Sequence, residues 1–221
     1  MSLRELEKIV ANIVLLPAAD RSMGLTSAEL APIFKDSALQ VQAIQVPGQP
    51  TQQIQIMSLR EQVLVAIGAS SLNFEDKSAD TPPKGRLAEI VNAFAGLLAT
   101  KGLSTFRAYG FNFEIAFDAP GDHPAARLLL DRFVQADKLK ERGKIEPVGA
   151  GLRLYFNTGD AKCDLRIEPR ENKPNSQRLF AKVNYHYELP DGALPSSDLM
   201  KSDFKGKWGI FTEQLERLLA S

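Results

Sequence analysis

Cysteine is almost absent from this sequence. Cys163 is the only one in 221 residues, so no disulfide can form within one chain. This composition is typical of proteins in a reducing compartment, and we expect a cytoplasmic location. Long apolar runs are absent too, because the early stretch 13–16 ends at Pro17 and is far too short for a bilayer span. The first residues mix charges, unlike a secretory signal, so no membrane association is expected.

An excess of charge of one sign is also missing. The chain has 27 Lys and Arg residues and 27 Asp and Glu residues, which gives a formal net charge of zero. Proteins that bind nucleic acid without sequence preference rely on a basic surface. The charge balance therefore argues against nucleic acid as the partner, while a local basic patch stays compatible with the sequence.

Sequence motifs of metal sites, nucleotide sites and catalytic nucleophiles are missing as well. His123 and His186 have no further His or Cys at the spacing of metal ligands. Gly149 and Gly151 lack the additional glycine and the following helix of a dinucleotide site. No Walker-type Gly-Lys-Ser/Thr and no Gly-x-Ser-x-Gly occurs. We therefore expect no metal, no cofactor and a buried, structural Cys163 rather than a catalytic one.

Alternating apolar and polar residues are what the sequence does have. Its hydrophobic content of 44% is enough for a buried core. In the first part of the chain the pattern predicts a strand at 9–16, a helix at 27–35 and three more strands near 39–44, 53–56 and 63–67. A change of phase at Ala43 and Ile44 predicts a bulge. A helix over 86–100 follows, and Gly102 is expected to end it in a left-handed conformation.

The same order of elements recurs in the second part. A strand at 111–118 precedes a helix that Asp122 or His123 can cap, and a charged loop at 135–146 follows. Further strands are expected at 148–156, 162–168 and 178–187. The chain then ends in a helix with an apolar stripe, which we expect to pack on the core: Phe204, Trp208, Phe211, Leu215 and Leu218.

The sequence thus predicts an α+β fold with an internal duplication. Each half, 1–103 and 104–221, contains a strand, a helix, three antiparallel strands and a helix, and the halves pack as one unit. This element order resembles that of the TATA-binding protein family, in which each half is a curved antiparallel sheet backed by helices. The resemblance implies the fold, and no residue role is carried over from it.

Strand parity predicts a polar sheet face in the second half. If 157–160 is a turn with Asn157 facing Asp160, then Leu154 faces Cys163 and Arg153 faces Asp164. The face could be the solvated side of the sheet, with an ion pair worth at most about 1 kcal/mol. It could also bind a partner or ligand, with arginines as fork-shaped donors for an anion. The candidate residues are Arg153, Tyr155, Asp164, Arg166, Lys182, Asn184 and His186.

Three functions are compatible with this pattern. We favour a non-catalytic binding or interaction protein whose open sheet surface contacts a partner protein or another copy of itself. An enzyme is the alternative, with Arg153, Asp164, Arg166 and His186 as its candidate residues. Nucleic-acid binding is the third, by analogy of topology alone. A pocket converging on the polar face would favour the enzyme, and a continuous positive stripe would favour nucleic acid.

Overall fold

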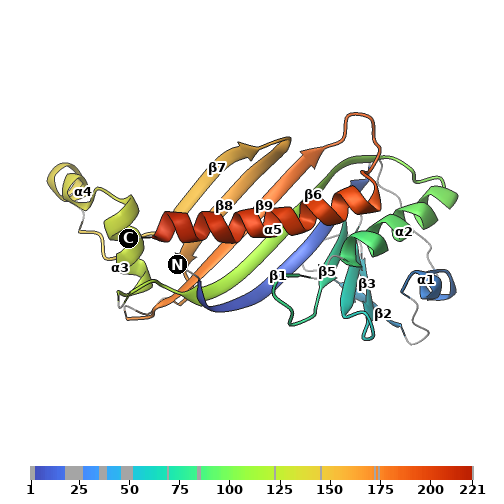
Figure 1. Ribbon diagram of the computed structural model, residues 1–221, viewed down its shortest axis with the longest axis horizontal. Coiled ribbons are helices and arrows are strands. Elements are labelled where there is room, and N and C mark those ends of the chain that lie inside the picture. The colour runs from blue at the N-terminus through green and yellow to red at the C-terminus, as the bar shows by residue number, and fades with distance from the viewer. Residues whose placement is uncertain are drawn as a thin grey trace. The chain divides into compact units, whose positions relative to one another are not determined.

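The chain folds into a nine-stranded antiparallel sheet backed by helices, an α+β fold (Figure 1). The computed structural model describes residues 3–17, 27–34, 39–45, 52–68, 70–83, 86–121, 123–144, 146–171, 173 and 175–220. The strand order in the sheet is β2-β3-β4-β5-β1-β6-β9-β8-β7. The α+β fold class predicted from the sequence is confirmed.

The elements follow one another in two similar series. The first is β1 (Arg4–Pro17), α1 (Ser27–Phe34), β2 (Gln40–Gln45), β3 (Gln52–Ser58), β4 (Val63–Ile67), β5 (Leu72–Asp76) and α2 (Arg86–Thr100). The second is β6 (Phe106–Asp118), α3 (Ala125–Phe133), α4 (Ala136–Gly143), β7 (Leu152–Thr158), β8 (Ala161–Pro169), β9 (Arg178–Glu188) and α5 (Ser197–Leu219).

Two compact units make up the chain, and each is built from separate stretches of sequence. Unit 1 contains 1–9, 113–185 and 209–221, and unit 2 contains 10–112 and 186–208. The strands β1, β6 and β9 and the helix α5 contribute residues to both units. The division of the sequence into halves 1–103 and 104–221 therefore stays a prediction about the order of elements along the chain.

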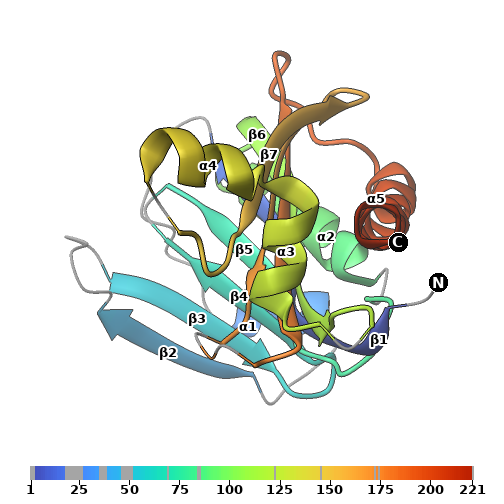
Figure 2. The same cartoon turned by 90° about the vertical axis from the view of Figure 1, so that its left-hand side faces the viewer.

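Unit 2 contains a run of four antiparallel strands, β2 to β5, which Figure 2 shows from one side. Helix α2 packs on β5, where Phe94 meets Phe74 edge to face with ring centroids 5.2 Å apart. Gly102 follows the helix with φ +79°, in the left-handed conformation that the sequence predicted.

Two expectations for this unit were wrong. β5 follows β4, so four strands and not three lie between the two helices. β5 has only five residues and ends in two acidic ones, which gives too short an apolar alternation to stand out in the sequence. The expected bulge is absent from the described pairing, because β2 pairs with β3 without interruption from Gln40 opposite Met57 to Gln45 opposite Gln52.

Unit 1 contains a helix where the sequence predicted a charged loop. The stretch 135–146 includes α4, which buries none of its residues and therefore shows no apolar face. Its charges suit a helix, since Asp137 lies in the first turn and Lys140 and Arg142 lie in the last. Lys144 follows at φ 52° and ends the helix in the left-handed region.

The start of α3 also differs from the expectation. Pro124 occupies the N-cap position, and no side chain caps the helix there. His123 is therefore not the cap, and Asp122 lies outside the described residues. Proline is tolerated at this point because the first amides of a helix have no partner within it.

The apolar stripe of α5 is buried, as predicted. In unit 2 the Phe204 ring meets Phe111 of β6 edge to face at 5.3 Å. In unit 1 the Phe211 ring stacks on Phe113 of β6 at 6.3 Å. Leu219, and not Leu218, takes the last fully buried position. Among the described helices, none is both long and apolar enough to cross a membrane.

Candidate functional site

The β7–β8 hairpin carries four of the seven candidate residues. Its loop has only two residues, because Thr158 pairs with Ala161. Gly159 takes the first loop position with φ +58°, as the tight primed hairpin turns require. The loop length matches the prediction, but the turn lies one residue further along the chain, so the register is shifted by two positions relative to the prediction.

A shift of two positions keeps every side chain on its predicted face. Leu154 faces Leu165 instead of Cys163, and Phe156 faces Cys163. The apolar side of the hairpin is thus the predicted one. On the polar side Arg153 lies directly opposite Arg166, and Asp164 lies opposite Tyr155.

An ion pair nevertheless joins Arg153 and Asp164, across a diagonal of the hairpin. Arg153 donates from Nε to Oδ1 of Asp164 at 2.9 Å and from an Nη to Oδ2 at 2.7 Å. Arg166 approaches the same Oδ2 at 3.6 Å. Directly opposed like charges destabilise a sheet. The carboxylate between the two guanidinium groups offsets that repulsion, so the three side chains form one cluster.

The electrostatics of the cluster hold both partners in their ionised forms. Hydrogen bonds from Arg153 are the largest cause that lowers the pKa of Asp164, assisted by the charges of Arg153 and Arg166. Partial burial of the carboxyl acts in the opposite direction. The bond to Asp164 raises the pKa of Arg153 in return. Asp164 is therefore an anion throughout the neutral range and has no proton to donate there.

Tyr155 extends the cluster toward solvent. The Arg153 guanidinium carbon lies 4.7 Å from the centre of the Tyr155 ring, within the range of a cation–π contact. The tyrosine itself is 68% exposed, which is unusual for a large aromatic side chain. We call Arg153, Tyr155, Asp164 and Arg166 the arginine–tyrosine cluster.

The remaining candidates lie on β9, the neighbour of β8 in the sheet. Lys182 and Asn184 alternate with the buried Val183 and Tyr185 in unit 1, so both lie on the half-exposed side of the strand. His186 continues this alternation along β9 but belongs to unit 2. The structure thus places six of the seven candidates in unit 1.

Cys163 has the structural role that the sequence predicted. Its thiol is buried on the apolar side of β8 and donates to the carbonyl of Ala161 at 3.6 Å. A nucleophilic thiol needs access and an activating base. The burial of Cys163 removes the first of these conditions.

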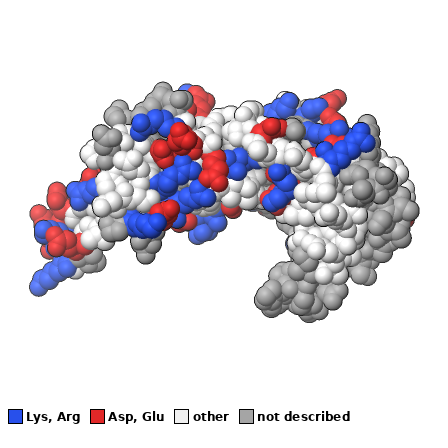
Figure 3. Space-filling model, turned by 90° about the horizontal axis from the view of Figure 1, so that it is seen from below, with Lys and Arg blue, Asp and Glu red and all other residues white. Residues whose placement is uncertain are grey.

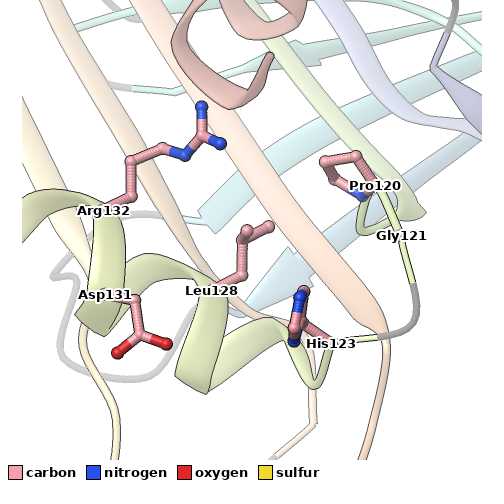
Figure 4. Close-up of a pocket in the computed structure, with 6 residues that line it drawn as sticks. All are labelled: Pro120, Gly121, His123, Leu128, Asp131 and Arg132. Carbon is pink, nitrogen blue, oxygen red and sulfur yellow. The ribbon is translucent and has the colours of Figure 1, made fainter. Parts of the chain in front are cut away.

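A hollow of about 430 Å³ lies beside α3 in unit 1 (Figure 4). Arg132 and Asp131 leave the helix in different directions (Figure 4). Arg132 donates to the carbonyls of Leu218 and Ala220 at the end of α5, and Asp131 accepts from Arg127 at 2.8 Å. Both side chains are therefore engaged structurally. The hollow is lined by Pro120, Gly121, His123, Leu128, Asp131 and Arg132.

A partly buried polar group in unit 2 was missed from the sequence. The Tyr187 hydroxyl donates to Oδ2 of Asp203 at 2.5 Å, and Lys207 lies 3.8 Å from the other carboxylate oxygen. Asp203 and Lys207 are four residues apart on a helix, and this spacing predicts an ion pair. Nothing local connects Tyr187 to them, because the contact joins a strand to a helix. The group fixes α5 to β9 within the unit.

Charges of both signs lie together on one face of the molecule. On the face shown in Figure 3, Lys and Arg alternate with Asp and Glu and form no continuous stripe of one sign. In the part of the chain that the structure describes, no three His, Cys, Asp or Glu residues are grouped closely enough to hold a metal ion. The surface chemistry of the site is thus that of mixed charges, amides and one exposed aromatic ring.

Comparisons with known proteins assign no role to the site. No protein-family model matches the chain. No curated protein matches it either. Among solved structures the chain is similar to Methanococcus jannaschii TBP, with 13% identical residues, 95% of this chain and 99% of that chain covered, and a TM-score of 0.31. A similarity at this level carries no inference about the site, and the fold class rests on the strands and helices described above.

Proposed function

We propose that this is a non-catalytic binding protein and that the arginine–tyrosine cluster on β7 and β8 is its contact point for a protein partner. The observation that carries the proposal is the exposed Tyr155 ring held against a guanidinium that a bidentate ion pair has already oriented. Tyrosine and arginine are the side chains that dominate binding energy in protein interfaces. A ring and a guanidinium that are fixed in advance lose little conformational entropy on binding.

The charges around the cluster favour an acidic partner. Arg166 and Lys182 add to the positive charge of this face, while the carboxylate of Asp164 is already engaged by Arg153. Guanidinium groups bind carboxylates with two parallel hydrogen bonds, so Arg166 is suited to an Asp or Glu of the partner.

An enzyme is less well supported by the same residues. Asp164 is held ionised by two arginines, which suits an ion pair and not a general acid. His186, the other candidate for proton transfer, lies on β9 and not on the hairpin that carries the cluster. The hollows of unit 1 that lie along α3 and α4 are lined by residues outside the cluster.

A site-specific photo-crosslinker tests the proposal in the native host. The crosslinking amino acid replaces Tyr155 in one version of the protein and Leu199, which is 65% exposed on α5, in a control version. We expect a discrete crosslinked protein from position 155 that is absent from position 199 and is identified by mass spectrometry. The band should weaken when Arg166→Ala is added. Identical crosslinks from both positions would contradict a binding role for the cluster.

A further inference from the structure

Among the described strands, β7 forms one end of the sheet. The strand order ends in β9-β8-β7, so among the described strands only β8 pairs with β7. Figure 1 shows β7 as the outermost of the strands of unit 1. Every edge strand presents unpaired backbone amides and carbonyls that can bind another strand.

The hairpin geometry identifies which backbone groups face outward. In a hairpin with a two-residue loop, the residues that flank the loop form a hydrogen-bonded pair, here Thr158 and Ala161. Bonded and non-bonded pairs then alternate along an antiparallel ladder. Arg153, Tyr155 and Asn157 therefore direct their amides and carbonyls away from β8. The same three residues have exposed side chains.

β7 also lacks the usual protection of an edge strand. Such strands are commonly very short, or carry lysine, proline or a bulge. β7 has seven residues, Leu-Arg-Leu-Tyr-Phe-Asn-Thr, without lysine or proline. Its pairing with β8 is unbroken from Leu152 opposite Ile167 to Thr158 opposite Ala161, so no bulge twists it out of line.

We propose that β7 pairs with β7 of a second copy of this chain, antiparallel and about a twofold axis at Leu154. This axis places Arg153 opposite Tyr155 of the second copy, and Leu152 opposite Phe156. Each polar residue then meets a polar one and each apolar residue an apolar one, so the strand is its own complement. The arginine–tyrosine contact that exists at 4.7 Å within one chain would be repeated between the two copies.

The charges of the chain permit this pairing. Arg153 is the one charged residue of β7, and it is neutralised by Asp164 of its own chain. The whole chain has a formal net charge of zero, so two copies do not repel one another at long range. An unrelated strand would need its own matching alternation, whereas a second copy supplies it in the same register.

The dimer goes beyond the proposed function, because it uses the backbone edge of β7 and not its polar face. Pairing at β7 would join the polar faces of two hairpins into one sheet surface. Two arginine–tyrosine clusters would then lie next to each other and could bind two acidic groups of one partner.

Sedimentation velocity of the full chain over a range of micromolar concentrations tests the pairing. Tyr155→Pro removes one outward amide, at a position of an edge strand where proline is tolerated. Tyr155→Val removes the aromatic ring and keeps the amide. We expect the natural chain to form a dimer, Tyr155→Pro to raise its dissociation constant roughly tenfold or more, and Tyr155→Val to raise it less. Circular dichroism verifies that each variant is folded.

A cysteine at the proposed axis gives a second measurement that does not depend on the proline variant. Leu154→Cys would place two thiols at a non-hydrogen-bonded pair, where Cα atoms are about 4.5 Å apart and a disulfide can form. The natural chain, whose single Cys163 is buried, is the control. A disulfide-linked dimer from Leu154→Cys alone supports the proposal. A chain that is monomeric at all concentrations overturns it, and so does a dimer that neither forms this disulfide nor responds to Tyr155→Pro.

Discussion

At the scale of single residues, Asp164 resolves a conflict that the hairpin register creates. The two-residue turn places Arg153 directly opposite Arg166, and the carboxylate of Asp164 contacts both. The Asp164 side chain remains 28% exposed and that of Arg153 45% exposed. Exposed ion pairs contribute little to stability because water screens them and ordered side chains lose entropy. The cluster is therefore expected to matter more for recognition than for folding.

Asp164→Ala should lower the free energy of unfolding by no more than about 1 kcal/mol at neutral pH. The pKa of Asp164 in the folded protein lies below its ordinary value of 3.8, mainly through the hydrogen bonds of Arg153. The pair therefore stabilises the fold above that ordinary value, and its contribution is lost as the pH falls through the lowered pKa. Urea denaturation at several pH values should show a constant difference from the natural protein above about pH 5 and a shrinking one in acid. A larger loss at neutral pH would mean that the face is buried.

At the scale of elements, α5 shows how one helix can serve two compact units. Phe204 and Trp208 belong to unit 2, and Phe211 and Leu215 belong to unit 1. In each unit the helix contributes an aromatic ring that contacts a phenylalanine of β6. The stripe was readable from the sequence, because steps of three and four residues place side chains on one helix face. The sequence pattern did not predict that the helix is divided between two units.

Trp208→Ala should cost roughly 3–5 kcal/mol of unfolding free energy, because it empties a large volume in a core where the indole is only 5% exposed. The matched control is Leu199→Ala on the same helix, whose side chain is 65% exposed and whose loss should change stability by less than about 0.5 kcal/mol. Chemical denaturation of both variants measures the difference. Equal stabilities would contradict a core role for the stripe.

Two glycines should respond to alanine in opposite directions. A Cβ at Gly149 would lie 2.8 Å from Cβ of Ala126 in α3, so Gly149→Ala should force α3 away and cost about 1–3 kcal/mol. Gly206 lies inside α5 with nothing within 4 Å of an added Cβ. Gly206→Ala should therefore stabilise the protein by about 0.5–1 kcal/mol, since alanine favours the helix. Thermal unfolding of the two variants should shift to lower and higher temperature, respectively.

At the scale of the whole molecule, charge is balanced in number, and one face shows both signs together. The chain has 27 basic and 27 acidic side chains, and the signs alternate on the face in Figure 3. Nucleic-acid binding without sequence preference depends on many Lys and Arg side chains that contact phosphate groups at the same time. Balanced charge also removes a barrier to association between copies.

We accordingly expect no salt-sensitive binding of random duplex DNA in the micromolar range. Fluorescence anisotropy with labelled duplex at low and moderate salt measures this directly. The result should be the same flat titration at both salt concentrations. Tight binding that weakens steeply with salt would instead support the nucleic-acid alternative.

The sequence by itself determined which side of each strand and helix is apolar, because alternation is a local property of the chain. It thereby predicted the fold class, the polar face with Arg153, Tyr155, Asp164 and Arg166, and the buried stripe of α5. A short strand such as β5 and a helix without a buried face such as α4 leave too weak a pattern to be read in this way.

Only the tertiary structure decided which residues face one another across the sheet and which elements contact one another. The register of β7 and β8 depends on the position of one turn. Moving that turn by one residue shifts the register by two positions and leaves the alternation unchanged. The contact of Tyr187 with Asp203 joins a strand to a helix across 16 residues of the chain. The division of α5 between two units depends on which strand residues each part of the helix contacts. Such contacts depend on packing in three dimensions, and local sequence patterns do not predict them.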